Sequence, residues 1–175
     1  MRVLFTNFGI VGYGVFTPYP ENARPQPRPR SSASISGLRF GAGLPITVRM
    51  LAKVCSAAVS GIEAYSVEVE VNAGYGDTLI VIVGLPDAAV KESRDRVTTA
   101  LINSGFTFTF GRTTINLAPA DVKKEGPSFD LPIAVGMAAA SEQLETDQLE
   151  NFVMVGELAL TGAVAPVGFL PYLQN

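Results

Sequence analysis

The residue types that could carry out chemistry are concentrated in one short stretch of the chain, between positions 121 and 130. Ser128 offers a hydroxyl nucleophile, and Lys124 offers an amine that could take up the proton of that hydroxyl. Charged residues and a glycine surround these two, so the candidate functional loop consists of Asp121, Lys123, Lys124, Glu125, Gly126, Ser128 and Asp130. The same composition is typical of an exposed turn whose polar side chains are only solvated. The loop therefore has two interpretations, a reactive site and an ordinary surface connection.

The elements on either side of this loop would position it. Thr113 to Leu117 has the β-branched, apolar character of a short buried strand, and Pro119 ends that strand. We expect Asp130 to cap a helix that has Pro132 in its first turn and continues as the alanine-rich run from Ile133 to Ala140. The loop is thus expected to join a buried strand to an apolar helix.

The start of this helix gives the loop its second chemical feature. The first amide groups of the helix are expected to point back towards Gly126 and Ser128. Free amides at such a place can hold an anion, a peptide carbonyl or a reacting oxyanion. We expect Lys123 and Lys124 to be exposed and fully charged, because both lie in the loop. The alternative is a well-capped helix that follows a loop without chemistry.

Residues 1–49 differ in composition from the rest of the chain. Six of the twelve prolines and a low-complexity, serine-rich stretch lie in this segment. We expect an extension without a packed core, disordered from about Pro18 to Pro45. A second hypothesis is that residues 1–49 are upstream sequence translated from an early start codon, because regular sequence begins directly after Met50. The predicted folded domain is residues 50–175, and its abrupt end suggests truncation before a further module.

Composition and charge exclude several functional classes. Residues 51–175 hold seven basic and fifteen acidic side chains, and their net charge of −8 argues against a nucleic-acid surface spread over the domain. Cys55 is the only cysteine and the chain has no histidine, so neither a disulfide framework nor a familiar zinc site is predicted. No apolar run reaches the roughly 18 residues that span a membrane. We therefore expect a cytoplasmic protein without a membrane partner.

Two strands and a helix are predicted ahead of the loop. Glu63 to Asn72 alternates apolar and polar residues, whereas Thr78 to Val83 is continuously β-branched or aliphatic. The two are expected to pair as a hairpin across the turn at 74–77, with the second strand inside the sheet. A helix follows, with Asp87 near its start and Gly105 after its end.

Three further patterns complete the expected elements. The charged run KESRDR at 91–96 has helical spacing and is typical of a solvated helix face. Phe106, Phe108 and Phe110 alternate with threonines, and such a row could stack bases, although the acidic balance favours a place in the core. Phe152 to Val155 predicts a strand, and 156–167 predicts a second hairpin that turns at residues 161–162.

Three segments resemble a known family. They are VGLPDAAVKESRDRV at 83–97, INLAPADVKKEGPSFDLPIAVG at 115–136 and GELALTGAV at 156–164. From about Ala57 to Val167, the chain resembles the amino-terminal domain of the magnesium-chelatase-like AAA+ proteins, the YifB and ComM family. The resemblance implies a mixed α/β fold like the second domain of ribosomal protein S5, which Lon peptidase domains share. It also implies a following AAA+ module that uses ATP and Mg²⁺. This chain has no G-x-x-x-x-G-K-[ST] phosphate loop, so we predict no cofactor for it.

The Lon resemblance tests the candidate loop residue by residue. Lon-type peptidases use a serine in a K-D-G-P-S-A-G-like loop and a lysine that follows a later G-G-L step. Lys124 to Ser128 is similar to this loop and places Ser128 at the nucleophile position. The next two residues depart from it, because Phe129 and Asp130 replace small residues, and at 168–171 a proline follows G-F-L. Proline cannot accept a proton, so the resemblance implies a scaffold without its catalytic pair, with Ser128 and the loop lysines as the remaining candidates.

The sequence thus predicts a domain of the S5 and Lon-peptidase class that serves as a non-catalytic regulatory or partner-binding module of a magnesium-chelatase-like AAA+ protein. For the full-length protein, the resemblance implies a homo-hexameric ATPase that acts on DNA, with branch migration in competence and recombination as its role. Two alternatives stay open: an active serine–lysine peptidase and an S5-like nucleic-acid-binding module.

Overall fold

The computed structural model describes residues 17–18, 51–60, 63–74, 76–107, 111–144 and 149–165. The strands in these ranges are β1 (Thr17–Pro18), β2 (Leu51–Ser60), β3 (Glu63–Ala73), β4 (Leu79–Val83), β5 (Arg112–Ala118), β6 (Phe152–Val153), β7 (Glu157–Leu158) and β8 (Val164–Ala165). The helices are α1 (Ala88–Asn103) and α2 (Asp130–Ala140), with short 3-10 helices η2 (Pro127–Phe129) and η3 (Leu149–Asn151). A six-stranded mixed sheet has the order β1-β6-β2-β3-β5-β4, and β7 pairs with β8. This mixed sheet with packed helices confirms the expected α/β class.

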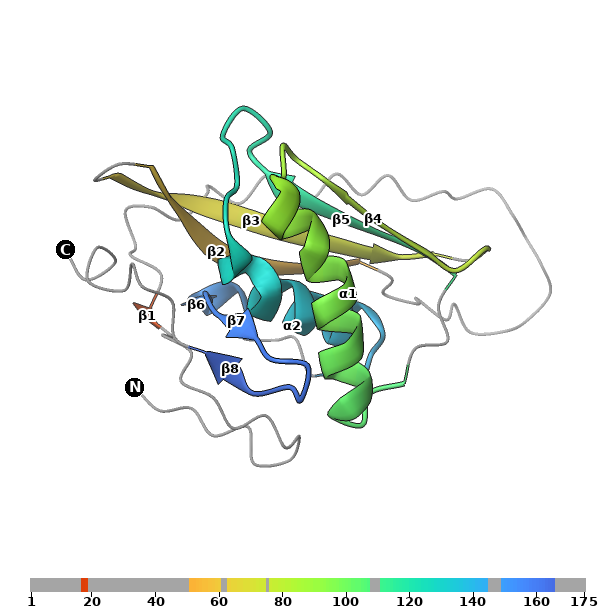
Figure 1. Cartoon of the computed structure of the whole chain (residues 1–175). Helices are drawn as coiled ribbons and strands as arrows, with labels where there is room; N and C mark the ends of the chain where they lie inside the picture. Colours follow the sequence, from red (N-terminus) through yellow and green to blue (C-terminus); the bar gives the residue numbers. More distant parts are fainter. Residues whose placement is uncertain are drawn as a thin grey trace.

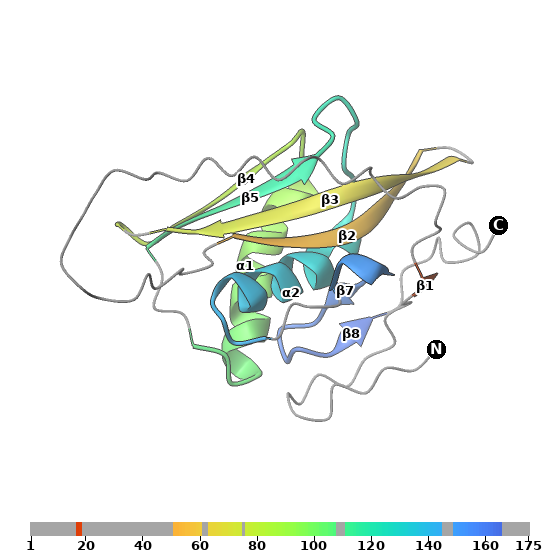
Figure 2. The ribbon, with the colours of Figure 1, turned by 180° about the vertical axis from the view of Figure 1, so that it is seen from behind.

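Both α-helices lie on the same side of the sheet, as Figures 1 and 2 show from opposite directions. Every residue of α2 is buried, and α2 packs against β2 and β3 on one side and α1 on the other. Gly136 allows this close packing, because a Cβ atom there would lie 2.7 Å from Cγ2 of Val71 in β3. The core thus lies between α2 and the inner face of the sheet, directly below the candidate loop.

The hairpin of this sheet is formed by β2 and β3. The two strands pair antiparallel over ten positions, from Leu51 opposite Asn72 to Ser60 opposite Glu63. Sequence patterning indicated β3 but not β2. The small residues of β2 hide its alternation, since alanine stands on both of its faces and a serine, Ser56, is among its buried residues.

The expected hairpin between 63–72 and 78–83 is wrong. β5 lies between these strands, pairing antiparallel with β3 and parallel with β4, so that β4 forms the edge of the sheet. The reason is the helix that follows β4: α1 returns the chain over the sheet and delivers β5 as a parallel neighbour. An apolar run cannot distinguish a central strand from this edge strand, in which Leu79 and Val83 are 47% and 41% exposed.

Other expected elements are confirmed. Asp87 is the N-cap of α1 and its Oδ1 accepts a hydrogen bond of 2.8 Å from the amide of Val90. The hairpin of β7 and β8 turns at Thr161 and Gly162. Phe106 is buried, whereas the other two phenylalanines of the aromatic row lie outside the described residues.

In the expected extension, the described residues are those of β1, which pairs antiparallel with β6. The expectation of disorder elsewhere in 1–49 falls outside the described residues. Neither α1 nor α2 is long and apolar enough to cross a membrane.

Candidate functional site

The candidate loop is attached by its backbone to the turn that leads from β4 into α1. The amide of Lys124 donates to the carbonyl of Leu85 at 3.2 Å, and the amide of Asp87 donates to the carbonyl of Lys124 at 3.0 Å. The amide of Gly126 also donates to Oδ2 of Asp87 at 3.3 Å. One carboxylate therefore caps α1 and holds the loop at the same time. This attachment contradicts the picture of a loop that is only solvated.

Lys124 is fully buried, which corrects the expectation of an exposed and fully charged side chain. Its Nζ reaches back to donate a hydrogen bond to the carbonyl of Pro119. Loss of contact with water lowers the pKa of Lys124 below its usual value, although the charge of Asp121 acts in the opposite direction. The pairing of its backbone with the β4–α1 turn fixes the loop in the position that buries this side chain.

The neighbouring lysine behaves as the sequence predicts. Lys123 is exposed, and its Nζ forms an ion pair of 2.6 Å with Oε1 of Glu125, which is also exposed. The hydrogen bond to Glu125 raises the pKa of Lys123. Asp121 is exposed as well. These three side chains form the outer, water-facing half of the loop. Lys123 is therefore exposed to water, whereas Lys124 is buried.

Asp130 does not cap α2, which corrects the second expectation. The chain already turns as a 3-10 helix over η2, so α2 begins at Asp130 and Phe129 occupies the cap position without a side-chain hydrogen bond. The Asp130 carboxylate instead turns sideways to α1 and is fully buried. The amides at this point are also occupied, because that of Asp130 donates to the carbonyl of Pro127 and that of Leu131 donates to the carbonyl of Gly156 at 3.0 Å.

The buried carboxylate of Asp130 accepts hydrogen bonds from two other elements. Arg96 of α1 binds it through Nε to Oδ2 at 2.8 Å and through Nη2 to Oδ1 at 3.1 Å. The hydroxyl of Ser93 donates to Oδ1, and the amide of Leu158 in β7 donates to Oδ2 at 3.2 Å. Four donor groups therefore neutralise one buried charge, and the cluster joins α1, α2 and β7.

Arg96 and Ser93 belong to the charged run that was expected to be a solvated helix face, and that expectation is wrong for both. Ser93 is fully buried. Arg96 turns inward, and its hydrogen bonds to Asp130 raise its pKa. It also donates to the carbonyl of Ala89 at 3.2 Å and lies 3.7 Å from Oε2 of Glu92.

A signal for one of these residues was present in the sequence. Ser93 lies three residues after Val90 and four before Val97, so it falls on the buried stripe of α1. Nothing in the sequence pattern distinguished Arg96 from the exposed arginine at position 94.

Ser128 lies in η2, two residues before Asp130. It is 4% exposed, its carbonyl accepts a hydrogen bond of 2.9 Å from the amide of Gly156, and the next residue, Phe129, is fully buried. Within the described part of the chain, the hydroxyl of Ser128 makes no hydrogen bond, and Nζ of Lys124 binds Pro119 instead. The segment 168–171, expected to carry the second catalytic position, lies outside the described residues.

The described residues also contain no cluster of three or more His, Cys, Asp or Glu side chains that could hold a metal ion. The contacts that the loop makes with other parts of the domain are those of its backbone with the β4–α1 turn and with Gly156, and those of the Asp130 carboxylate with α1 and β7.

Comparison with known proteins places this chain in a family. The sequence model described as subunit ChlI of Mg-chelatase matches residues 67–174, more than half of the chain. The YifB protein of Salmonella typhimurium is 52% identical over 117 residues, which are 67% of this chain and 23% of that protein. The competence protein ComM of Haemophilus influenzae is 49% identical over 122 residues, which are 69% of this chain and 24% of that protein. A Mycobacterium tuberculosis protein is 40% identical over 122 residues.

The chain spans about a quarter of the length of the curated relatives it matches. The matched region contains the three elements that meet at the Asp130 cluster, namely α1, the beginning of α2, and β7. By this match the chain belongs to the ChlI family of magnesium-chelatase-like proteins.

Proposed function

We propose that this domain is a non-catalytic regulatory or partner-binding module of a magnesium-chelatase-like AAA+ protein. The observation that carries the proposal is that the side chains of the peptidase-like loop bind groups of the domain itself. Lys124 binds the carbonyl of Pro119, Asp130 binds Arg96, and Ser128 of η2 is buried, with its carbonyl bonded to the amide of Gly156 just before β7. A serine hydroxyl needs a neighbouring base to act as a nucleophile, and no hydrogen bond joins Ser128 to one among the described residues.

The role of the full-length protein is a further part of this proposal. One relative is a competence protein, and the family resemblance implies an AAA+ ATPase that migrates DNA branches. We propose a cytoplasmic, homo-hexameric protein in which this domain contacts its own AAA+ module, and in which ATP and Mg²⁺ bind that module alone.

An active serine–lysine peptidase is the second candidate, because one observation favours it. Lys124 is buried with a lowered pKa and stands four residues before Ser128. A buried lysine of this kind is a better base than an exposed one, because loss of water favours its neutral form. Movement of its Nζ from Pro119 towards Ser128 would create the missing pair.

A serine-reactive fluorophosphonate probe separates the two candidates. The proposal predicts no label on Ser128 and no cleavage of casein by the wild-type chain. Ser66→Ala provides a matched control, since Ser66 is an exposed serine of β3 outside the loop. Label on the wild type that persists in Ser66→Ala but is lost in Ser128→Ala and Lys124→Met would establish the peptidase and overturn the proposal.

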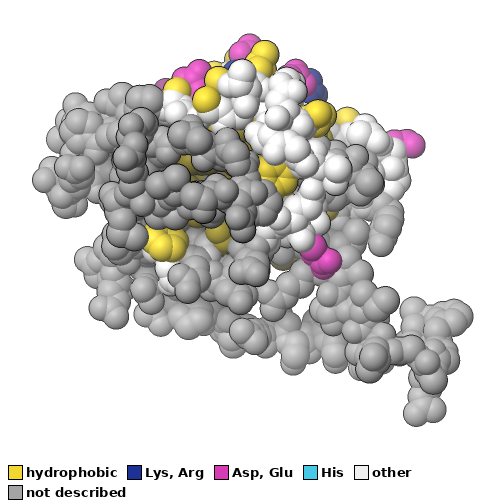
Figure 3. Space-filling view, turned by 90° about the horizontal axis from the view of Figure 1, so that it is seen from below, with side chains coloured by type: hydrophobic (Ala, Val, Ile, Leu, Met, Phe, Trp, Pro, Cys, Tyr) yellow, Lys and Arg dark blue, Asp and Glu magenta, His cyan; other side chains and the backbone are white. Residues whose placement is uncertain are grey.

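Binding of DNA by the domain itself is tested separately. On the face that Figure 3 shows, the described side chains form no large patch of Lys and Arg. The net charge of residues 51–175 is −8. We expect passage through a DNA column without retention at about 0.1 M salt. Retention that weakens steeply as salt rises would instead assign phosphate contacts to this domain.

A further inference from the structure

The edge strand β4 lacks the features that normally protect the edge of a sheet. It pairs with β5 on one side, and no described strand pairs with its other side. Its five residues, Leu-Ile-Val-Ile-Val, include neither a charge nor a proline. Edge strands of soluble proteins usually carry such residues, because free amides and carbonyls along an apolar strand readily pair with another chain. The exposed apolar ends of β4, Leu79 and Val83, strengthen this tendency.

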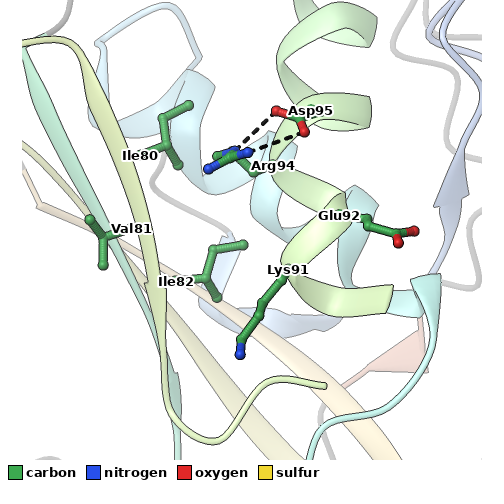
Figure 4. Close-up of a pocket in the computed structure, with 7 residues that line it drawn as sticks. All are labelled: Ile80, Val81, Ile82, Lys91, Glu92, Arg94 and Asp95. Carbon is green, nitrogen blue, oxygen red and sulfur yellow. Dashed lines mark hydrogen bonds and ion pairs between the residues drawn. The ribbon is translucent and has the colours of Figure 1, made fainter. Parts of the chain in front are cut away.

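A pocket of about 370 Å³ lies beside this strand. It is lined by Ile80, Val81, Ile82, Lys91, Glu92, Arg94 and Asp95. Figure 4 shows Ile80 and Ile82 pointing towards α1 and Val81 pointing away from it. The surface formed by β4 and the facing side of α1, hereafter the β4 edge, could therefore receive both the backbone and the side chains of an added strand.

We propose that the β4 edge binds the β4 edge of a second copy of this chain, with the two β4 strands antiparallel about a two-fold axis at Val81. In this register Leu79 lies opposite Val83 of the second copy, and Ile80 lies opposite Ile82 of the second copy. Val81 lies opposite Val81. Each cross-strand pair is apolar, so the strand is complementary to itself when reversed, as an interface between identical surfaces requires.

The charges of α1 have the same self-complementarity. In Figure 4, Asp95 lies at the level of Ile80, whereas Lys91 lies at the level of Ile82. The two-fold axis brings Ile80 beside Ile82 of the second copy, so Lys91 would face Asp95 of the second copy and the reverse. Lys91 is exposed and makes no ion pair within the described part of the chain. Asp95 is exposed and bound by Arg94 at 3.0 Å.

Of the two other charged residues of the pocket, Arg94 stays bound to Asp95 of its own copy, and Glu92 does not enter this interface. Glu92 points away from β4 in Figure 4 and lies 3.7 Å from Arg96. Two equivalent Lys91–Asp95 contacts would thus stand at the rim of a continuous sheet of both copies. This inference stands whether or not Ser128 is reactive.

Sedimentation of the full 175-residue chain tests the inference, with two charge reversals as the decisive variants. Lys91→Glu and Asp95→Lys each replace both rim attractions of the dimer by repulsions, so each should raise the dimer dissociation constant by about tenfold. An equal mixture of the two variants should recover wild-type dimerisation, because both pairs are opposite in charge again in the mixed dimer. Lys123→Glu makes the same charge change in the candidate loop and should have no effect.

A second pair of variants tests the position of the axis. Val81→Glu places two like charges opposite each other and should abolish the dimer, whereas the uncharged, β-branched Val81→Thr should keep it. Hydrogen exchange should show that the β4 amides pointing away from β5 are protected in the wild type and exposed in Val81→Glu. A wild-type chain that stays monomeric up to about 1 mM overturns the proposal. A dimer that survives Val81→Glu, or a mixture of reversals that fails to recover, overturns it equally, since the interface would then lie elsewhere.

Discussion

Arg96 and Asp130 stand 34 residues apart in the sequence and form an ion pair with two hydrogen bonds, of 2.8 Å and 3.1 Å, at the centre of the candidate site. The aspartate is fully buried, whereas a quarter of the arginine side chain (24%) is exposed. This pair ties α1 to the first turn of α2, and α2 in turn carries the candidate loop.

Removal of the arginine should destabilise the domain strongly. Arg96→Met leaves the Asp130 carboxylate buried without its cation, and we expect a loss of about 3 to 5 kcal/mol in the free energy of unfolding. Arg94→Met is the matched control, because Arg94 pairs with Asp95 at the surface and should contribute less than about 1 kcal/mol. Urea denaturation of both variants measures the difference. Equal losses would show that the buried pair adds no more than a surface pair.

Asp130 should also matter more than Ser128. Asp130→Ala removes the acceptor for Arg96, Ser93 and the amide of Leu158, and so should cost more than the roughly 1 kcal/mol of a lost helix cap. Ser128→Ala removes a hydroxyl without a partner within the described residues, and should change stability by about 1 kcal/mol or less. Thermal unfolding of both variants checks this order. A larger loss for Ser128→Ala would contradict it.

Burial of Lys124 should make stability depend on alkaline pH. The folded state lowers the pKa of Lys124 below the usual value of 10.5, so the folded state binds fewer protons than the unfolded state as pH approaches that value. The free energy of unfolding should therefore rise as pH increases from the folded pKa towards 10.5. Lys124→Met should lack this rise. The measurement compares urea midpoints of the two proteins between pH 7 and pH 10.5, and parallel curves would rule out the effect.

The outer face of the sheet should show a pH dependence of the same sign in the acid range, where stability falls as pH falls. Hydrogen bonds from Lys53 and Asn116 lower the pKa of Glu70 below its usual value of 4.5. Its contribution to stability is therefore full above pH 4.5 and is lost as pH falls through the lower folded pKa. Lys53→Met should cost less than about 1 kcal/mol at pH 7, because the pair is partly exposed. The difference between the two proteins should vanish in acid, and a constant difference would contradict this cause.

Gly136→Ala should destabilise the domain by overpacking. The added Cβ would lie 2.7 Å from Cγ2 of Val71, and such strain costs about 1 to 3 kcal/mol. Val71→Ala removes the colliding methyl group, so the double variant should lose less stability than the sum of the two single losses. Additive losses in guanidinium unfolding would show that α2 shifts to relieve the contact.

Several features followed from the sequence alone, because they depend on neighbouring residues. The alternation of Glu63 to Asn72 predicted β3, and Asp87 and Gly105 marked the two ends of α1. The proline after the Thr113–Leu117 run marked the end of β5. Local conformational preferences decide these features, and they are the same wherever the segment lies in the fold.

The tertiary structure decided the features that depend on distant partners. Whether β4 lies inside the sheet or at its edge depends on where α1 delivers β5, and the apolar residues of β4 fit either place. In the same way, the sequence placed Lys124 and Asp130 in a polar loop, but the β4–α1 turn buries the lysine and Arg96 draws the aspartate away from its own helix. A buried charge takes the side-chain direction that reaches its counter-charge, because an unpaired charge inside a protein is far costlier than a lost cap.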